Sequence, residues 1–208
     1  MCQHPPKNKS NASLQRLREL IRRYWQWRLD ESPEFATTCS VYDYDNRLTV
    51  ITVESIDRQL AKCREFLAEL PQIDMRKIEK IDRMNLILLK DHLQTFVSGH
   101  RWRQYGIYNA VNFLENVVID FTCRLTDSAK LTSELDFDKY IQRLTLVEKV
   151  VDSNIEMMGE AGKQGTTLHA VSVEKLVKDL KTVADTPTED SVLYEPFIKK
   201  LHQLRSKY

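Results

Sequence analysis

The side chains that could hold a catalytic metal are scattered along this sequence of 208 residues. A zinc site on a helix needs two histidines four residues apart with a glutamate beside the first. The sequence contains five histidines, none followed by a glutamate: His4, His92, His100, His169 and His202. His92 lies in an apolar helical pattern, so we interpret it as a core histidine rather than a ligand. We therefore predict no metal and no bound cofactor in this chain.

Carboxylate pairs, nucleophiles and phosphate-binding loops are also missing as complete motifs. Glu156 and Glu160 share a helix face without a third ligand nearby, and we expect both to face solvent. No serine lies in a GxSxG motif, and no cysteine has an activating context. The loop GEAGKQG, residues 159–165, lacks the GxxxxGK[ST] spacing. These observations predict no enzymatic activity for this chain by itself.

The segment RRYWQWRLDESPEFAT, residues 22–37, suggests three possible roles: nucleic-acid binding, membrane binding or internal packing. On a helical wheel its aromatic side chains share the leucine face, whereas Arg22 and Arg23 point away. Bases must meet aromatic and basic groups from one side, so we favour a packing helix and predict neither nucleic-acid nor membrane binding. Basic residues are nevertheless concentrated in residues 1–28, which leaves open an interaction through this helix.

Arg28 lies inside the apolar arc of this helix and needs a partner. Burying its charge alone would cost several kcal/mol. We expect a salt bridge with Asp43 or Asp45 in the loop that follows. The alternative is that Arg28 binds a substrate carboxylate, which makes it the candidate substrate-binding residue.

Composition favours a helical, cytoplasmic protein. Hydrophobic residues make up 42% and charged residues 29%, whereas 5 glycines and 6 prolines are too few for a turn-rich β fold. The longest apolar runs, such as LILL at 86–89, fall far short of the roughly 20 residues that cross a bilayer. No apolar segment follows the charged N-terminus, so we expect no secretory signal. The four cysteines form no CxxC pair, which favours free thiols and the cytoplasm.

Hydrophobic periodicity predicts an all-α fold, an irregular multi-helix bundle with long antiparallel helices and ordered loops. Residues 1–12 read as a disordered basic tail and 13–208 as one helical domain. The segment 99–132 is ambiguous, because its β-branched residues also allow a strand or a buried irregular segment. Helices are predicted to start at Ser13, at Ser32-Pro33, at Ile56, at the N-caps Asp74, Asp136 and Ser172, and at YEPF. Pro71 ends the helix that starts at Ile56, and Gly159 ends the helix that Asp136 caps.

Five short signatures occur in a family-like order: YWQWRLDESPEFATT, YDYDNRL, IDRMNLILLKDHLQTF, FDKYIQRL and SVLYEPF. In this order the chain resembles the N-terminal part of the domain of unknown function 885 family. The resemblance implies large, mostly helical proteins related to zinc metallopeptidases, with a histidine–glutamate motif in their C-terminal half. This sequence lacks that motif, so the resemblance assigns no metal ligand or catalytic base here and implies zinc for full-length members alone.

Together these observations predict a non-catalytic helical scaffold or binding module. An apolar surface that packs against the rest of the domain in longer relatives would be exposed here, and would associate with a protein partner or with itself. The alternative is the substrate-binding part of a zinc-dependent hydrolase whose catalytic half is missing or supplied by another chain.

Overall fold

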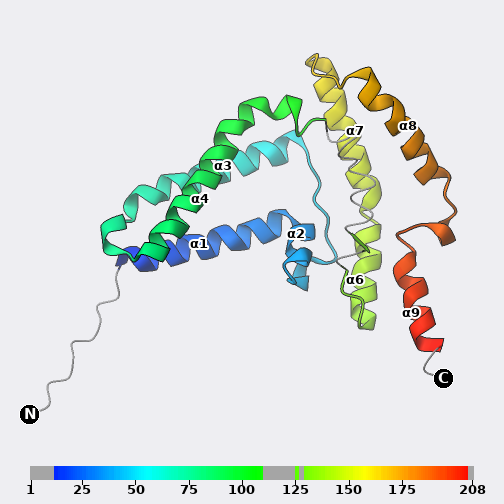
Figure 1. Ribbon diagram of the computed structural model, residues 1–208, viewed down its shortest axis with the longest axis horizontal. Helices are drawn as coiled ribbons and strands as arrows, with labels where there is room; N and C mark the ends of the chain where they lie inside the picture. The colour runs from blue at the N-terminus through cyan, green and yellow to red at the C-terminus, as the bar shows by residue number, and fades with distance from the viewer. Residues whose placement is uncertain (1–11, 110–124, 127–128, 206–208) are drawn as a thin grey trace, which may run out of the picture. The chain divides into compact units, whose positions relative to one another are not determined.

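The computed structural model describes residues 12–109, 125–126 and 129–205 (Figure 1). Every secondary-structure element in these ranges is helical, which confirms the predicted fold class. The chain divides into two compact units. Unit 1 contains residues 1–28 and 56–101, and unit 2 contains residues 29–55 and 102–208. The predicted basic tail and most of the ambiguous segment 99–132 lie outside the described residues, and a single domain over 13–208 stays a prediction.

Unit 1 is built from α1 (Ala12–Glu31), whose last residues belong to unit 2, with α3 (Val53–Glu69) and α4 (Lys80–Gly99). Figure 1 shows α3 and α4 as a hairpin. Its core joins all three helices through residues spaced three or four apart, which places them on one face of each helix. The buried members are Leu17, Leu20, Cys63, Phe66, Leu70, Ile73, Ile78, Leu86, Leu89 and Leu93.

The aromatic side chains of α1 do not all point inward as expected. Trp27 is half-buried, and its ring centroid lies 5.6 Å from that of Phe66. Trp25, however, is 43% exposed, so the prediction was wrong for this residue. The reason is geometric: Trp25 lies two residues before Trp27 and thus about 200° away around the helix.

The link between α3 and α4 also differs from the prediction. Pro71 ends α3, as expected, inside a 3-10 turn (Leu70–Gln72). Asp74 caps another 3-10 turn (Met75–Lys77) rather than the long helix itself. Ile78 is extended and buried in the core, which separates this turn from α4.

Unit 2 begins with α2 (Pro33–Thr38) and the 3-10 turn η1 (Tyr42–Tyr44). Ser32 is the N-cap and Pro33 the first helical residue, which confirms that start signal. The 3-10 turn η4 (His100–Tyr105) begins at the end of unit 1. The later elements are α6 (Glu134–Leu144), α7 (Val147–Lys163), α8 (Ala170–Asp185), η5 (Thr188–Asp190) and α9 (Glu195–Arg205).

Aromatic contacts fix α9 against α6. The ring centroids of Phe137 and Phe197 lie 5.5 Å apart, and those of Tyr140 and Phe197 lie 5.8 Å apart. The Tyr140 hydroxyl donates a hydrogen bond to the Leu193 carbonyl at 3.1 Å. Burial raises the pKa of Tyr140 to about 12, although the nearby charge of Arg143 opposes this rise. The hydroxyl therefore stays protonated and acts as a donor at neutral pH.

Several predicted boundaries in unit 2 were wrong. The periodicity predicts one helix from Asp136 to Gly159, but a turn after Leu144 separates α6 from α7; here the Thr145 hydroxyl donates to the Gln142 carbonyl at 2.7 Å. GEAGKQG is not a loop, because α7 continues through it to Lys163 and Gly165 then takes the left-handed conformation (φ +70°). His169, not Ser172, caps α8.

Asp136 is the third residue of α6 rather than its cap. The N-cap is Ser133, whose side chain accepts a hydrogen bond from the Asp136 N–H, while the Asp136 carboxylate accepts from the N–H of Ser133 at 2.9 Å. Burial acts to raise the pKa of this carboxyl, but hydrogen bonds from Thr132 and Ser133 outweigh it and hold the pKa well below its usual range.

We expect Asp136→Asn to lower the melting temperature at neutral pH, because the amide is a weaker acceptor. The pKa of Asp136 is lower in the folded chain than its ordinary 3.8, so its stabilisation exists above that value and is lost as pH falls toward the folded pKa. The difference between wild type and variant should therefore shrink below about pH 4. Thermal melts followed by circular dichroism across this range check it; a constant difference would contradict it.

Among the described residues, no helix is long and apolar enough to cross a membrane.

Candidate functional site

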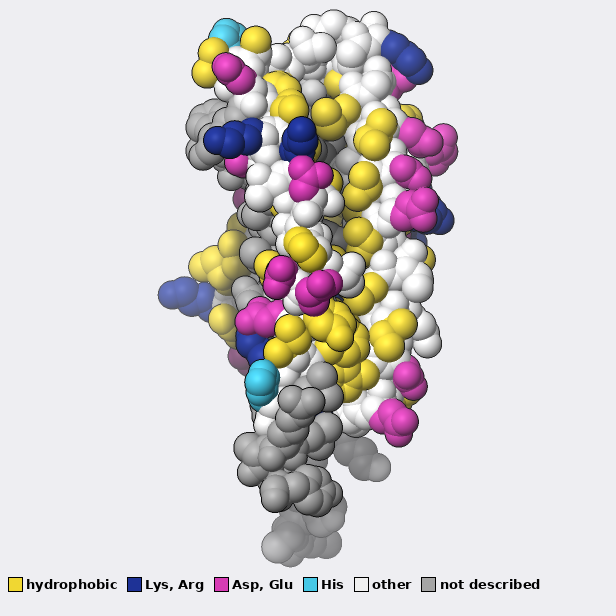
Figure 2. Space-filling model, turned by 90° about the vertical axis from the view of Figure 1, so that its right-hand side faces the viewer, with side chains coloured by type: hydrophobic (Ala, Val, Ile, Leu, Met, Phe, Trp, Pro, Cys, Tyr) yellow, Lys and Arg dark blue, Asp and Glu magenta, His cyan; other side chains and the backbone are white. Residues whose placement is uncertain are grey.

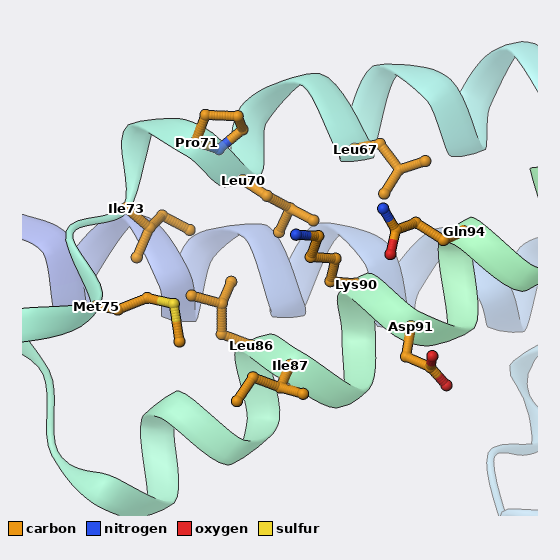
Figure 3. Close-up of a pocket in the computed structure, with 10 residues that line it drawn as sticks. All are labelled: Leu67, Leu70, Pro71, Ile73, Met75, Leu86, Ile87, Lys90, Asp91 and Gln94. Carbon is orange, nitrogen blue, oxygen red and sulfur yellow. The ribbon is translucent and has the colours of Figure 1, made fainter.

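An open groove lies in unit 1 between the end of α3 and the first half of α4 (Figure 3). Its volume is about 690 Å³. We call it the Pro71 groove. It is lined by Leu67, Leu70, Pro71, Ile73, Met75, Leu86, Ile87, Lys90, Asp91 and Gln94.

The floor and the rim of the Pro71 groove differ in exposure. Leu70, Ile73 and Leu86 are 4–7% exposed and belong to the core of unit 1. Met75 and Ile87 are 40% and 49% exposed at the rim. The groove exists because Pro71 stops α3 and the chain then returns through two 3-10 turns, which leaves space before α4 begins.

Polar side chains gather at the other end of the groove. Lys90, Asp91 and Gln94 follow Ile87 on α4 by three, four and seven residues, and therefore share one helix face. All three are exposed. From Leu86 to Gln94 the groove follows α4 for about 12 Å. An ammonium, a carboxylate and an amide can pair with polar groups of a bound molecule while the floor holds its apolar part.

Comparison with known families decides where this chain belongs. A family model described as a bacterial protein of unknown function (DUF885) matches residues 33–208. This chain belongs to the DUF885 family. The DUF885 match starts at the first residue of α2, so it contains the whole Pro71 groove but not Arg28. No curated protein and no solved structure matches the chain.

A second, shallower pocket lies on the other flank of α4 in this DUF885 member. Its volume is about 340 Å³, and its lining includes Tyr24, Trp25, Leu88 and His92. His92 is exposed, so its prediction as a core histidine was wrong. Its ring instead lies edge-on to Tyr24, with centroids 6.0 Å apart. The apolar row correctly predicted that this segment is a helix, but His92 lies at the edge of the row rather than within it.

Arg28, the candidate substrate-binding residue, is half-buried and does not line the Pro71 groove of this DUF885 chain. Its charge acts on Tyr24: burial raises the pKa of Tyr24, and Arg28 opposes the rise. A substrate-binding role for Arg28 stays a prediction.

Asp45 does meet a buried arginine, but this arginine is Arg143 of α6. The Arg143 guanidinium lies 3.4 Å from the Asp45 carboxylate, and Arg143 is 1% exposed. The same group donates to Thr37 Oγ1 at 2.9 Å and to the carbonyls of Arg47 and Tyr44 at 2.9 and 3.0 Å. These bonds tie α6 to the loop after α2. One sequence signal could have identified Arg143: it lies three residues after Tyr140, inside the apolar spacing of its helix.

The carboxylate pair of α7 behaves as predicted for Glu156, which is exposed. Glu160 is half-buried, and its carboxylate accepts from Gln164 at 2.9 Å and lies 3.4 Å from Lys163. In the part of this DUF885 protein that the structure describes, no group of three His, Cys, Asp or Glu side chains lies close enough together to hold a metal ion.

Proposed function

We propose that this DUF885 protein is a non-catalytic binding module whose Pro71 groove holds a short amphipathic segment of a protein partner. The volume and the lining of the groove support this proposal. Its volume of about 690 Å³ falls within the roughly 300–1,000 Å³ of ligand sites, and its buried apolar floor ends in a few polar groups, as such sites do. We also propose a cytoplasmic location, which suits the free thiols of Cys39 and Cys63.

The lining favours an elongated ligand over a compact one. Apolar side chains of the partner would contact Leu70, Ile73 and Leu86, and its polar or backbone groups would meet the polar end of the groove. Because the groove follows α4 for about 12 Å, it suits two turns of a helix or about four extended residues.

We expect Ile87→Glu to abolish selection of groove-binding peptides. A library of short peptides displayed on phage is selected on wild type and, in parallel, on the variant. Ile87 is 49% exposed, so the new carboxylate places a charge on the apolar rim without disturbing the core. Enrichment of peptides that share apolar positions is expected on wild type, and binding of those peptides should weaken at least about tenfold on the variant.

Ile81→Glu is the matched control. Ile81 is also an exposed isoleucine of α4, at 65%, and does not line the groove. Its variant should bind the selected peptides like wild type. Equal enrichment on both glutamate variants, or no enrichment on wild type, would reject the Pro71 groove as a binding site.

The polar end of the groove supports a second function, the substrate-binding part of a zinc-dependent hydrolase completed by another polypeptide. Lys90, Asp91 and Gln94 provide donors and acceptors that suit the backbone of a peptide substrate. Under the second function, a selected peptide should be cleaved only when another polypeptide supplies the zinc-bearing half, and a chelator should stop that cleavage. Hydrolysis of the peptide by the purified chain alone with added zinc, abolished by a chelator, would overturn both proposals.

A further inference from the structure

The helix α7 has an apolar face that is exposed. Val151, Ile155 and Met158 are 36%, 62% and 37% exposed. Their spacing of four and three residues aligns them along one side of the helix, and we call them the α7 stripe. Figure 2 shows hydrophobic side chains gathered in a band on the side of the molecule that it draws, with acidic side chains along one edge.

The α7 stripe is separate from the side of the helix that packs inside unit 2. The packed side contains Val150, Asn154 and Met157, which are buried. Taking 100° per residue, its centre lies about 100° from the centre of the stripe. The helix therefore has an inner face and a second, adjoining apolar face that is exposed. A contiguous exposed apolar patch marks an interaction site, whereas single exposed apolar side chains are ordinary surface.

An acidic row borders the stripe on its outer side. Glu148, Asp152 and Glu156 recur every four residues, are exposed, and lie about 50°, 90° and 130° from the centre of the stripe. Glu160 is half-buried and lies on the opposite side of the helix from the stripe. The whole helix has four acidic side chains against Lys149 and Lys163. A partner that binds the stripe therefore gains affinity from positive charges placed beside its apolar contacts.

We propose that the α7 stripe docks a basic amphipathic helix of another protein. Apolar residues of that helix, spaced three and four apart, pack on Val151, Ile155 and Met158, and lysine or arginine residues beside them face the acidic row. From Glu148 to Met158 the surface extends about 15 Å, the length of a helix of about 10 residues. The stripe and the Pro71 groove share no residue, so this inference does not depend on the proposed function.

Charge decides between the possible occupants. A second copy of α7 would bring another acid-rich helix against the same stripe, and like charges across an interface cost affinity. The basic helix α1 of this chain is also unsuitable, because its apolar residues Leu17 and Leu20 are already buried in unit 1. A separate polypeptide with a free apolar face and basic flanks satisfies both requirements.

Two synthetic peptides of about 18 residues test the proposal, each with leucines at helical spacing. One has lysines beside the leucines and the other has glutamates. Affinities are measured by fluorescence anisotropy against the full chain. We expect the lysine peptide to bind wild type at least about tenfold more tightly than the glutamate peptide, with the difference falling as salt is raised.

Charge-reversal variants locate the binding. Asp152→Lys/Glu156→Lys should weaken the lysine peptide about tenfold and strengthen the glutamate peptide. Glu174→Lys/Asp185→Lys is the control, since it makes the same change in net charge with exposed residues of α8. This control should leave the preference for the lysine peptide intact. Ile155→Ser should weaken both peptides, because it removes apolar area and leaves the acidic row in place.

Three results would overturn the inference. The first is equal affinity of wild type for the two peptides, and the second is the same loss of affinity in both charge-reversal variants. The third is a dimer in light scattering that Ile155→Ser converts to a monomer, since the stripe would then be occupied by a second copy of this chain.

Discussion

Replacing Arg143 with methionine is expected to lower the free energy of unfolding by about 3–5 kcal/mol, the usual cost of removing one partner of a buried ion pair. The methionine fills a similar volume but donates no hydrogen bond. It would leave Asp45, which is 8% exposed, with the Thr37 hydroxyl at 2.7 Å as its remaining contact among those described. It would also remove the guanidinium donor from the part-buried carbonyls of Arg47 and Tyr44, of which the Tyr44 carbonyl keeps the hydrogen bond from the Arg47 N–H at 2.9 Å.

Urea denaturation at equilibrium measures this loss. Arg143→Lys should recover little of it, because one ammonium cannot reproduce the planar geometry with which the guanidinium reaches its acceptors. Burial lowers the pKa of Arg143, while Asp45 and Glu34 oppose that shift. Arg22→Met is the control: Arg22 is an exposed arginine paired with Glu19 three residues away, and its variant should unfold at the wild-type midpoint. A similar midpoint for Arg143→Met would show that the buried network does not stabilise unit 2.

Replacing Phe66 with alanine should cost about 3–5 kcal/mol, as large-to-small changes in a packed core do. Phe66 is 1% exposed and lies at the centre of the aromatic cluster of unit 1. Its ring meets Tyr24 edge-on, with centroids 5.7 Å apart, and lies 5.6 Å from Trp27. The Lys62 ammonium lies 5.4 Å from the ring centroid. Alanine would leave a cavity that the rigid rings of Tyr24 and Trp27 cannot fill.

Tryptophan fluorescence during urea unfolding checks this prediction, because Trp27 lies against the altered site. Phe66→Leu should cost clearly less than Phe66→Ala, since leucine keeps most of the buried volume. Trp25→Ala, which removes an aromatic ring of α1 that is 43% exposed, should have a small effect. If Phe66→Ala and Trp25→Ala were equally mild, the core of unit 1 would not be organised around Phe66.

The sequence predicts most helices because their cores depend on local spacing. Ile56, Leu60, Cys63 and Leu67 recur at helical intervals before Pro71, and α3 covers them all. Boundaries fail where tertiary structure decides them. The burial of Ile78 delays the start of α4, and the side-chain hydrogen bond of Thr145 accompanies the break between α6 and α7. Neither effect leaves a signal in periodicity.

The candidate sites were harder to predict than the helices. A helical wheel gives the direction of a side chain but not the depth to which it is buried. The wheel pointed to Arg28 as an arginine for Asp43 or Asp45, and it gave no sign that the buried Arg143 lies 3.4 Å from the Asp45 carboxylate. The Pro71 groove combines residues from α3, α4 and two 3-10 turns, and its shape depends on where the chain reverses. The periodicity does contain the α7 stripe, because Val151, Ile155 and Met158 recur four and three residues apart, but spacing alone does not distinguish an exposed apolar row from a buried one.

The family model does not include α1, although α1 supplies two residues to the core of unit 1. The family model matches from Pro33, yet Leu17 and Leu20, which lie before it, are 0% and 1% exposed against α3 and α4. A polypeptide trimmed to the matched region would uncover Phe66 and Leu93 on the side that faces α1. Any shortened form of this protein that keeps the core of unit 1 therefore has to include α1 as well as the segment that the family model recognises.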